Sequence, residues 1–300
     1  MRLITIIGPT ATGKTSVAVR LASLLGRAPI LSADSRQVYR GMDLGTGKDL
    51  SEYEVGGQKI AHYLIDIAEP GERYNLARYL ADARAVLSRL PERPTPILCG
   101  GTGLYVEALK KGYTLAAEPE DPALRVRLES LSPEELQKEW YRLKDPAGPD
   151  LADPRNPRRL IRAIERRLAA GASPVVYPPH PGPIFCLDMP RDERRRRISE
   201  RLRTRLDEGM VEEVRRLLAR LGDPSPLLAY GLEYRYVTEY LLGRSDYEDM
   251  VKKLETAIRQ FSKRQMTWIR GMERRGLAVT YVPPADTPLE TARRILDLLG

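Results

Sequence analysis

The chain has 300 residues, which allows one large domain or two modest ones and is enough for a sizeable hydrophobic core. Its 49 lysines and arginines outweigh 41 acidic residues, for a formal net charge of +8. This balance favours an anionic partner only weakly, because many soluble proteins are mildly basic. Cys99 and Cys186 lie in apolar runs, which predicts buried thiols and argues against a disulfide or metal ligands. Without a signal peptide or a membrane-spanning run, we expect a cytoplasmic protein with no membrane partner.

The segment from Gly8 to Thr15, GPTATGKT, matches the phosphate-binding pattern G-x-x-x-x-G-K-[ST]. The apolar run 3–7 before it predicts a buried strand, and the apolar spacing of 16–25 after it predicts a helix. In that context the N–H groups of the loop and of the first helical turn point at one anion. Lys14 adds a positive charge, and Thr15 adds a hydroxyl that can bind Mg2+. The pattern does not say which phosphate compound is bound.

Two further apolar runs end in polar segments. The run 29–32 leads into SADSRQVY at 32–39, and the run 96–99 leads into GGTGLY at 100–105. Because functional groups gather at the carboxyl ends of parallel strands, we expect Asp34 and Thr102 to lie at the same edge as Lys14. From the residues alone, Asp34 is equally compatible with a helix cap.

The remaining pattern alternates helices and strands around a proline-rich interruption. We predict a loop over 41–59, strands over 60–67, 184–187 and 277–282, and helices over 75–90, 191–222 with a break at Gly209, 226–242, 246–272 and 289–299. The expected fold is α/β, a P-loop NTPase-like parallel sheet flanked by helices, formed by residues 1–112 and 183–300. Residues 113–182 are predicted to form a small all-helical insertion domain.

Charge and aromatic patterns suggest further roles. Residues 155–167 carry six arginines against one glutamate, which favours a phosphate-backbone contact over a merely solvated face. Residues 191–220 mix eleven arginines with seven acids, which is typical of a salt-bridged solvent face. Phe261 and Trp268 are seven residues apart and share a helix face, so we expect them in the core and not as platforms for base stacking.

Taken together, these motifs resemble the tRNA dimethylallyltransferase family, which prenylates the adenosine on the 3′ side of the anticodon. The matching segments run in family order over nearly the whole chain. They are GPTATGKT at 8–15, SADSRQVY at 32–39, HYLIDI at 62–67, GGTGLY at 100–105, DPALR at 121–125, NPRRLIRA at 156–163 and KRQMTW at 263–268. The phosphate loop is common to many families, whereas SADSRQVY and KRQMTW are far more specific.

The resemblance implies a set of roles for individual residues. The diphosphate of dimethylallyl diphosphate would be held by Gly8, Pro9, Thr10, Ala11, Thr12, Gly13, Lys14 and Thr15, with Mg2+ at Thr15. Asp34 would be the general base, acting with Lys14 and Thr15. The anticodon stem-loop of tRNA would be contacted by Asp34, Ser35, Arg36, Gln37, Thr102, Arg125, Arg158, Arg159, Leu160, Ile161, Arg162, Lys263, Arg264 and Gln265. A monomer is compatible with these roles, and the sequence leaves the oligomeric state open.

One segment departs from the family pattern. The G-Y-R-[EQ] segment common in relatives is here Gly231-Leu232-Glu233-Tyr234-Arg235, so Glu233 stands where relatives carry arginine. Arg235 is a candidate replacement, although an offset of two residues places it on another helix face. The main alternative function is a small P-loop kinase that uses ATP on a metabolite or a nucleic-acid end. A non-catalytic RNA-binding module is disfavoured, because the residues of the loop and Asp34 are intact.

Overall fold

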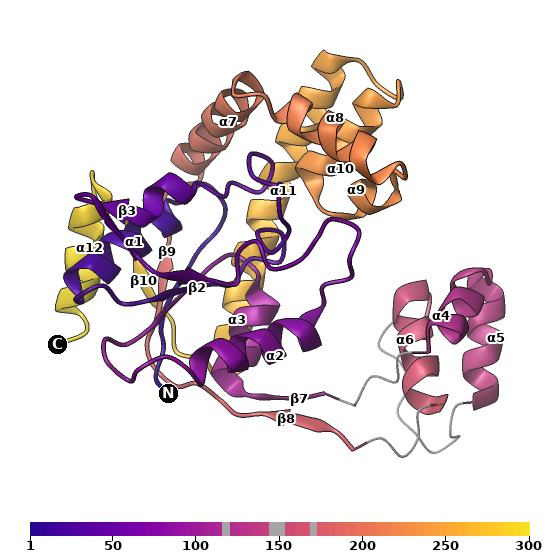
Figure 1. Cartoon of the computed structure of the whole chain (residues 1–300), viewed down its shortest axis with the longest axis horizontal. Coiled ribbons are helices and arrows are strands. Elements are labelled where there is room, and N and C mark those ends of the chain that lie inside the picture. Colours follow the sequence, from indigo (N-terminus) through magenta and orange to yellow (C-terminus); the bar gives the residue numbers. More distant parts are fainter. Residues whose placement is uncertain (116–120, 144–153, 169–172) are drawn as a thin grey trace. The chain divides into compact units, whose positions relative to one another are not determined.

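The computed structural model describes residues 1–115, 121–143, 154–168 and 173–300. It divides into two compact units, which are coloured along the sequence in Figure 1. The first, the sheet unit, comprises Met1–Gly112 and Pro178–Gly300. The second, the helical unit, comprises Tyr113–Tyr177, part of which lies outside the described residues.

The sheet unit is built on six parallel strands in the order β10-β9-β1-β6-β2-β5. Thr5 at the centre pairs with Leu98 on one side and Ile184 on the other. The predicted strand over 60–67 is much shorter in the structure, because Leu64 and Asp66 have φ values of 65° and 54°, which end an extended strand. The strands are β1 (Ile4–Ile7), β2 (Ile30–Ser32), β5 (His62–Tyr63), β6 (Ile97–Cys99), β9 (Ile184–Leu187) and β10 (Thr280–Val282).

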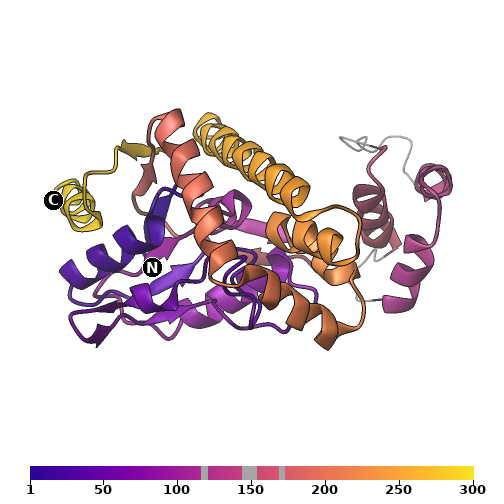
Figure 2. The ribbon, with the colours of Figure 1, turned by 90° about the horizontal axis from the view of Figure 1, so that it is seen from above.

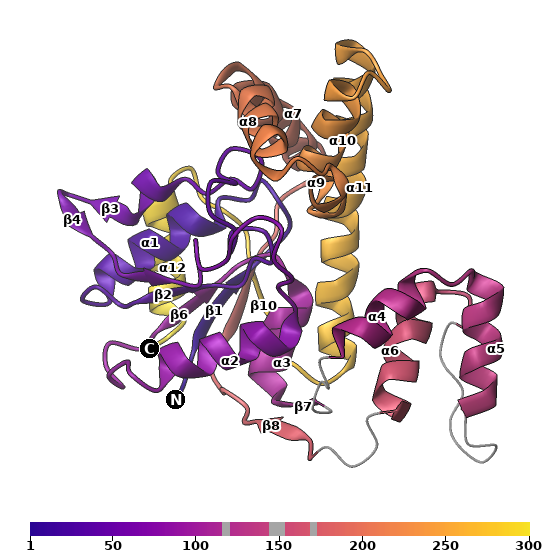
Figure 3. The same cartoon turned by 45° about the vertical axis from the view of Figure 1, so that its right-hand side comes forward.

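Helices cover both faces of this sheet (Figure 3). On one face α1 (Lys14–Leu24) packs against α12 (Pro288–Asp297), and on the other lie α2 (Leu76–Leu87) and α3 (Gly103–Lys111). Ile4 and Ile6 alternate along β1 and join the core formed with α1 and α12. The expected P-loop-like α/β architecture is therefore confirmed.

Five further helices lie between β9 and β10 in the sequence; the first four stand beyond the carboxyl ends of the strands, and the fifth extends from there along α3. They are α7 (Arg191–Asp207), α8 (Met210–Leu221), α9 (Ser225–Ala229), α10 (Leu232–Leu241) and α11 (Tyr247–Arg274). The expected break at Gly209 is confirmed, with a φ of 101°. A second break at Gly231, with a φ of 136°, splits the single helix predicted over 226–242. Helices α7 and α11 pack side by side (Figure 2), and α10 packs on α8, α9 and α11.

The segment predicted as a loop over 41–59 contains the short helix η1 (Leu50–Tyr53) and a hairpin of β3 (Glu54–Val55) and β4 (Gln58–Lys59). Its first part is fixed by the buried Lys48, whose ammonium donates to the backbone oxygen of Tyr39 and to the carboxylates of Asp43 and Asp66. Since the charge is fully paired, burial of this lysine is tolerated.

Glu213 of α8 holds the same loop from the other side. Its carboxylate accepts hydrogen bonds from the backbone N–H groups of Asp43 at 3.0 Å, Leu44 at 2.7 Å and Gly45 at 3.1 Å. The Tyr234 hydroxyl donates a fourth, at 2.6 Å. A side chain at Gly45 would meet the Tyr234 ring at 2.7 Å, so glycine is required for this close approach. Four donors converge on one buried carboxylate, which ties the loop to α8 and α10.

The helical unit contains α4 (Pro122–Glu129), α5 (Pro133–Leu143) and α6 (Pro157–Leu168). Their apolar faces meet in a small core formed by Leu128, Leu136, Leu160, Ile161 and Ile164. The expectation of an all-helical insertion needs one correction, because β7 (Tyr113–Leu115) and β8 (Val175–Tyr177) pair as an antiparallel ribbon. Both segments are rich in β-branched and aromatic residues, which favour strands.

Two expectations about the whole chain can be compared with the structure. Cys99 and Cys186 are free and buried, as predicted. Among the described residues, no helix combines the length and apolarity needed to cross a membrane.

We predict that Glu213→Ala lowers the free energy of unfolding by about 3 kcal/mol, because it leaves buried N–H groups without an acceptor. The measurement is urea unfolding followed by circular dichroism. Glu212→Ala is the matched control, since Glu212 is exposed and pairs only with Arg215 on the surface of the same helix. Equal stability of the two variants would contradict the role assigned to Glu213.

Candidate active site

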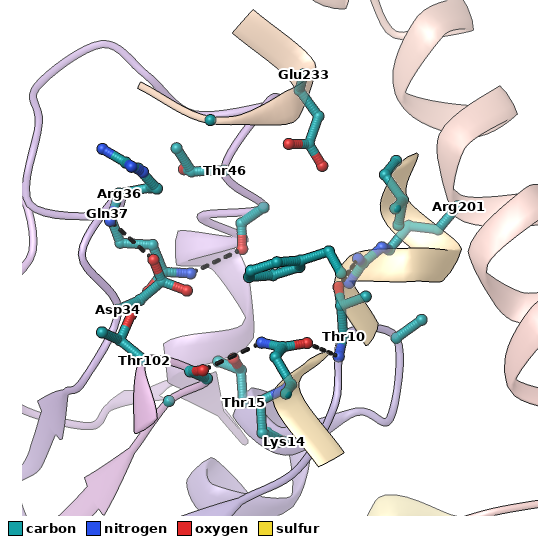
Figure 4. Close-up of a pocket in the computed structure, with 18 of the residues that line it drawn as sticks. Thr10, Lys14, Thr15, Asp34, Arg36, Gln37, Thr46, Thr102, Arg201 and Glu233 are labelled. Carbon is teal, nitrogen blue, oxygen red and sulfur yellow. Dashed lines mark hydrogen bonds between the residues drawn. The ribbon is translucent and has the colours of Figure 1, made fainter. Parts of the chain in front are cut away.

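A cavity of about 780 Å³ opens at the carboxyl ends of β1, β2 and β6 and is bounded by residues of α7, α10 and α11 (Figure 4). It lies entirely within the sheet unit. Most of the sequence-predicted site residues of that unit line it, as expected from the shared strand edge. They are Thr10, Ala11, Gly13, Lys14, Thr15, Asp34, Ser35, Arg36, Gln37, Thr102, Arg264 and Gln265.

The phosphate loop has the backbone shape that an anion cradle requires. Gly8 has a φ of 151°, and a side chain there would come within 2.6 Å of the Leu187 backbone oxygen, so no other residue fits. Gly13, with a φ of 75°, begins α1 in the left-handed region. Pro9 and Thr12 do not line the cavity, and the Thr12 hydroxyl donates to the Pro9 oxygen at 2.9 Å. Gly13 and the first turn of α1 therefore border the cavity.

Lys14 lies at the base of the cavity. Its ammonium donates to the Pro9 oxygen at 2.8 Å. The pKa of Lys14 is lowered to about 8, chiefly by burial and with a smaller contribution from Arg201, while Cys99 and Asp34 act in the opposite direction. A lysine held in this way gains strongly from an anion, because the anion restores the charged state.

Asp34 and Thr102 meet across the ends of β2 and β6. One oxygen of Asp34 accepts from the Arg36 N–H at 2.8 Å. The Thr102 hydroxyl accepts from the Ser35 N–H at 3.0 Å, which joins the two strand ends. Among the described residues nothing donates to the second Asp34 oxygen, so it is available to accept a proton from a ligand. Asp34 can thus hold the cap-like turn with one oxygen and present the other to the cavity.

Both polar atoms of the Gln265 side-chain amide form hydrogen bonds with backbone groups. Its oxygen accepts from the Thr10 N–H at 2.8 Å, and its nitrogen donates to the Gly101 oxygen at 3.1 Å. A side chain at Gly101 would come within 2.5 Å of that nitrogen. In this structure Gln265 therefore positions two loops of the site.

Helix α7 supplies site residues that the sequence analysis missed. Arg197, Arg201 and Arg205 line the cavity, although residues 191–220 were expected to form a solvent face. The Arg201 guanidinium donates to the Thr10 hydroxyl, and burial, followed by repulsion from Arg205, lowers its pKa to about 10. The solvent-face expectation does hold for Arg196, which pairs with Glu193 and Glu200. A signal was present in the sequence, because three arginines at intervals of four form one column along the helix.

The segment that departs from the family pattern places an acid in the cavity. Glu233, near the start of α10, lines it, and burial raises the pKa of its carboxyl. Arg235 is not a lining residue and pairs with Glu239 at the surface. Arg235 is therefore not the replacement for the arginine of relatives.

The expectation for Phe261 and Trp268 was wrong. Both side chains line the cavity and keep exposed fractions of 40% and 41%. Their spacing does put them on one helix face, but that face of α11 borders the cavity instead of the core. A side chain at Gly103 would meet the Trp268 ring at 2.1 Å, so glycine makes room for the indole.

The remaining predicted residues are not among those that line the cavity. Lys263 is exposed on α11 and is not a lining residue. In the helical unit, Arg158 and Arg159 are exposed, whereas Arg125 bonds Glu165 and Glu129. Two other predicted tRNA contacts, Leu160 and Ile161, are core residues with exposed fractions of 0% and 4%. Their buried side chains leave any RNA contact of α6 to its arginines, which include Arg162, half-buried beside Glu165.

Comparison with known proteins gives consistent matches. The family model described as IPP transferase matches residues 37–272, and a model described as isopentenyl transferase matches residues 1–66. The chain is 48% identical to tRNA dimethylallyltransferase 2 of Bacteroides fragilis, over 96% of this chain and 94% of that protein. It is 49% identical to tRNA dimethylallyltransferase 1 of Porphyromonas gingivalis, over 99% and 100%.

A solved structure agrees with these matches. The crystal structure of the tRNA isopentenylpyrophosphate transferase from Bacillus halodurans is 31% identical, with a TM-score of 0.67 over 99% of this chain and 96% of that one. The family model covers well over half of the sequence, and it includes most of the cavity-lining residues outside the phosphate loop. The chain therefore belongs to the IPP transferase family and is a prenyltransferase.

Proposed function

We propose that the chain transfers the dimethylallyl group from dimethylallyl diphosphate to N6 of the adenosine at tRNA position 37, next to the anticodon. The observation that carries the proposal is the shared cavity, which brings the phosphate loop and Asp34 to one edge of the sheet. An anion cradle and a carboxylate are the two elements that this substitution requires. The relatives named above as tRNA dimethylallyltransferases support the choice of substrates.

The donor site provides for the leaving group. As the allylic C–O bond breaks, negative charge grows on the bridging oxygen of the diphosphate. Lys14, the first residues of α1 and Arg201 all line the cavity in which that charge would develop. Fixed donors of this kind stabilise the charge without reorganisation during the reaction.

The acceptor nitrogen needs a base. The exocyclic amine of adenine is a weak nucleophile because its lone pair is delocalised into the ring, and it must lose a proton as the new N–C bond forms. Asp34 offers a carboxylate oxygen toward the cavity, held in place by the Arg36 N–H. General-base assistance of this type contributes about 10²–10⁴-fold.

The cavity fits a Mg2+ ion that arrives with the diphosphate. Among the described residues, no cluster of three or more histidines, cysteines or acids forms a dedicated metal site. Mg2+ commonly keeps several waters and binds one or two protein oxygens together with phosphate oxygens, and Thr15, which lines the cavity, would supply such an oxygen from its hydroxyl. When bound, the ion would neutralise charge on the diphosphate.

The RNA part of the proposal rests on charge and exposure. Arg158 and Arg159 are exposed on α6, in the segment 155–167 that carries six arginines against one glutamate. Arg36 and Arg264 line the cavity itself. Because the target base is stacked in the anticodon loop, it must be extruded into the cavity at a cost of about a few kcal/mol. Unstacked loop bases are what RNA-binding proteins recognise.

The first test is incubation of the protein with unmodified tRNA, Mg2+ and dimethylallyl diphosphate, followed by digestion and mass spectrometry. We expect prenylated adenosine from the anticodon loop. A parallel reaction with ATP tests the kinase alternative, which family membership already disfavours. Phosphate transfer from ATP without prenylation would refute the proposal.

We predict that Asp34→Asn lowers kcat by about 10²–10⁴-fold while tRNA affinity is largely kept. Asparagine still accepts from the Arg36 N–H, so the turn is preserved and only the base is lost. The control is Asp207→Asn, an exposed acid at the end of α7 outside the cavity. Normal turnover by Asp34→Asn would remove Asp34 from this role.

The pKa of Lys14 predicts a pH dependence of donor binding. Because the pKa is about 8 in the free protein instead of 10.5, Lys14 is neutral above that pH, and anion binding must then take up a proton. We expect the Kd for inorganic diphosphate to rise between about pH 8 and about pH 10. Lys14→Arg stays charged throughout this range and serves as the control, since ionisation of the diphosphate affects both proteins equally. Parallel pH profiles would contradict the assignment.

A further inference from the structure

Arg205 of α7 lines the cavity although only 7% of its surface is exposed. Among the described residues, it has no hydrogen bond to any group and no ion pair. Its nitrogens are not among the fully enclosed side-chain atoms without a partner, so its N–H donors face the cavity and are left unsatisfied by the described part of the protein. Such a group is expected where a ligand supplies the missing acceptors.

Space for this side chain is provided by Gly47. A side chain at that position would come within 1.8 Å of an Arg205 nitrogen, so glycine alone allows the guanidinium to lie against the loop. The loop is fixed there, since the Gly47 oxygen accepts from the Gln37 side chain at 3.2 Å. Arg205 is therefore positioned by packing, without a bond that would occupy its donors.

In the described part of the chain, the charged groups around Arg205 form no ion pair with it. It repels Arg201, one turn earlier on the same helix, and this repulsion contributes to the lowered pKa of Arg201. The Glu233 carboxylate interacts electrostatically with both guanidinium groups, but it is too far from either one to form an ion pair. Arg201 and Arg205 thus line one cavity. The described acids of that cavity, which include Glu233, Asp49 and Asp34, form no ion pair with either guanidinium, which suits an anion with more than one charged group.

We propose that Arg205 is a second anion-binding guanidinium of the donor site, which binds the terminal phosphate of an organic diphosphate. The inference rests on the proposed function, because it assumes a diphosphate donor held by the phosphate loop. It assigns the distal phosphate to Arg205 and thereby explains why a buried arginine is left without a protein partner. It also predicts selection of diphosphates over monophosphates, since a single phosphate in the loop would not reach this group.

The test measures binding of inorganic diphosphate with Mg2+ by calorimetry. We expect Arg205→Met to weaken binding by about tenfold or more, because charge-assisted hydrogen bonds are lost. Inorganic monophosphate should bind both proteins within about threefold, because it loses no such contact. Arg203→Gln is the matched control, an exposed arginine on the same helix outside the cavity.

The melting temperature checks the fold of Arg205→Met. We expect it to equal or exceed that of the natural protein, because an unpaired buried charge is replaced by an apolar side chain. Diphosphate affinity equal to that of Arg203→Gln would overturn the inference. Equal losses for diphosphate and monophosphate would also overturn it, because they would indicate a general effect on the loop.

A relocation experiment gives an independent answer. The double variant Arg205→Met, Glu233→Arg places the guanidinium on α10 on the opposite side of the same space. We expect it to recover at least part of the diphosphate affinity that Arg205→Met loses, whereas Arg205→Met with Glu233→Gln should recover less. If neither double variant recovers affinity beyond Arg205→Met, a shared anion subsite is refuted.

Failure of this inference can be told apart from failure of the proposed function. Prenyl transfer by the natural protein, combined with unchanged diphosphate binding by Arg205→Met, would overturn the role of Arg205 alone. Absence of prenyl transfer, combined with a loss of diphosphate binding in Arg205→Met, would refute the dimethylallyl donor and leave Arg205 as a diphosphate ligand.

Discussion

The site depends on one side-chain amide that joins two loops from different strands. Gln265 accepts from the N–H of Thr10 and donates to the oxygen of Gly101, so it fixes the phosphate loop and the turn after β6 to the same point of α11. Without this bridge the loops would be linked through the sheet alone. Because α11 also carries Arg264, Phe261 and Trp268 into the cavity, the same contact sets the position of the wall opposite Asp34.

The cavity separates two chemical tasks within one space. Lys14 and the α7 arginines surround the region above the phosphate loop, whereas Asp34 and Thr102 lie at the ends of the neighbouring strands. In the proposed reaction, the carboxylate that would remove a proton is thereby kept apart from the cations that would stabilise the leaving group. Lys14 still interacts with Asp34, which opposes the loss of charge that burial imposes on the lysine. The region above the phosphate loop and the region near Asp34 therefore interact through long-range electrostatics more than through direct contacts.

The sequence predicted the strand-end residues well, because a local rule places them. An apolar run followed by a polar turn fixes Lys14, Asp34 and Thr102 at one edge of a parallel sheet, whatever the rest of the chain does. Helical periodicity, by contrast, shows which residues share a helix face, but it does not show whether that face borders solvent, the core or a cavity. Arg201 and Arg205 were therefore assigned to solvent, and Phe261 and Trp268 to the core. The structural roles of Lys48 and Glu213 were not predicted for a similar reason. Glu213 binds backbone N–H groups that are distant in sequence, and Lys48 binds carboxylates within irregular loops.

The register of β1 has a consequence for biosynthesis. This strand pairs with Ile97 and its neighbours on one side and with Ile184 and its neighbours on the other, and the loop that follows it is completed by α7 and α11. A ribosome must therefore make most of the chain before the first strand acquires both neighbours, and nearly all of it before Gln265 is available. Pairing across such separations is slow. During synthesis, the N-terminal segment exposes an apolar strand that has no partners yet. This is the stage at which the protein most needs protection from aggregation.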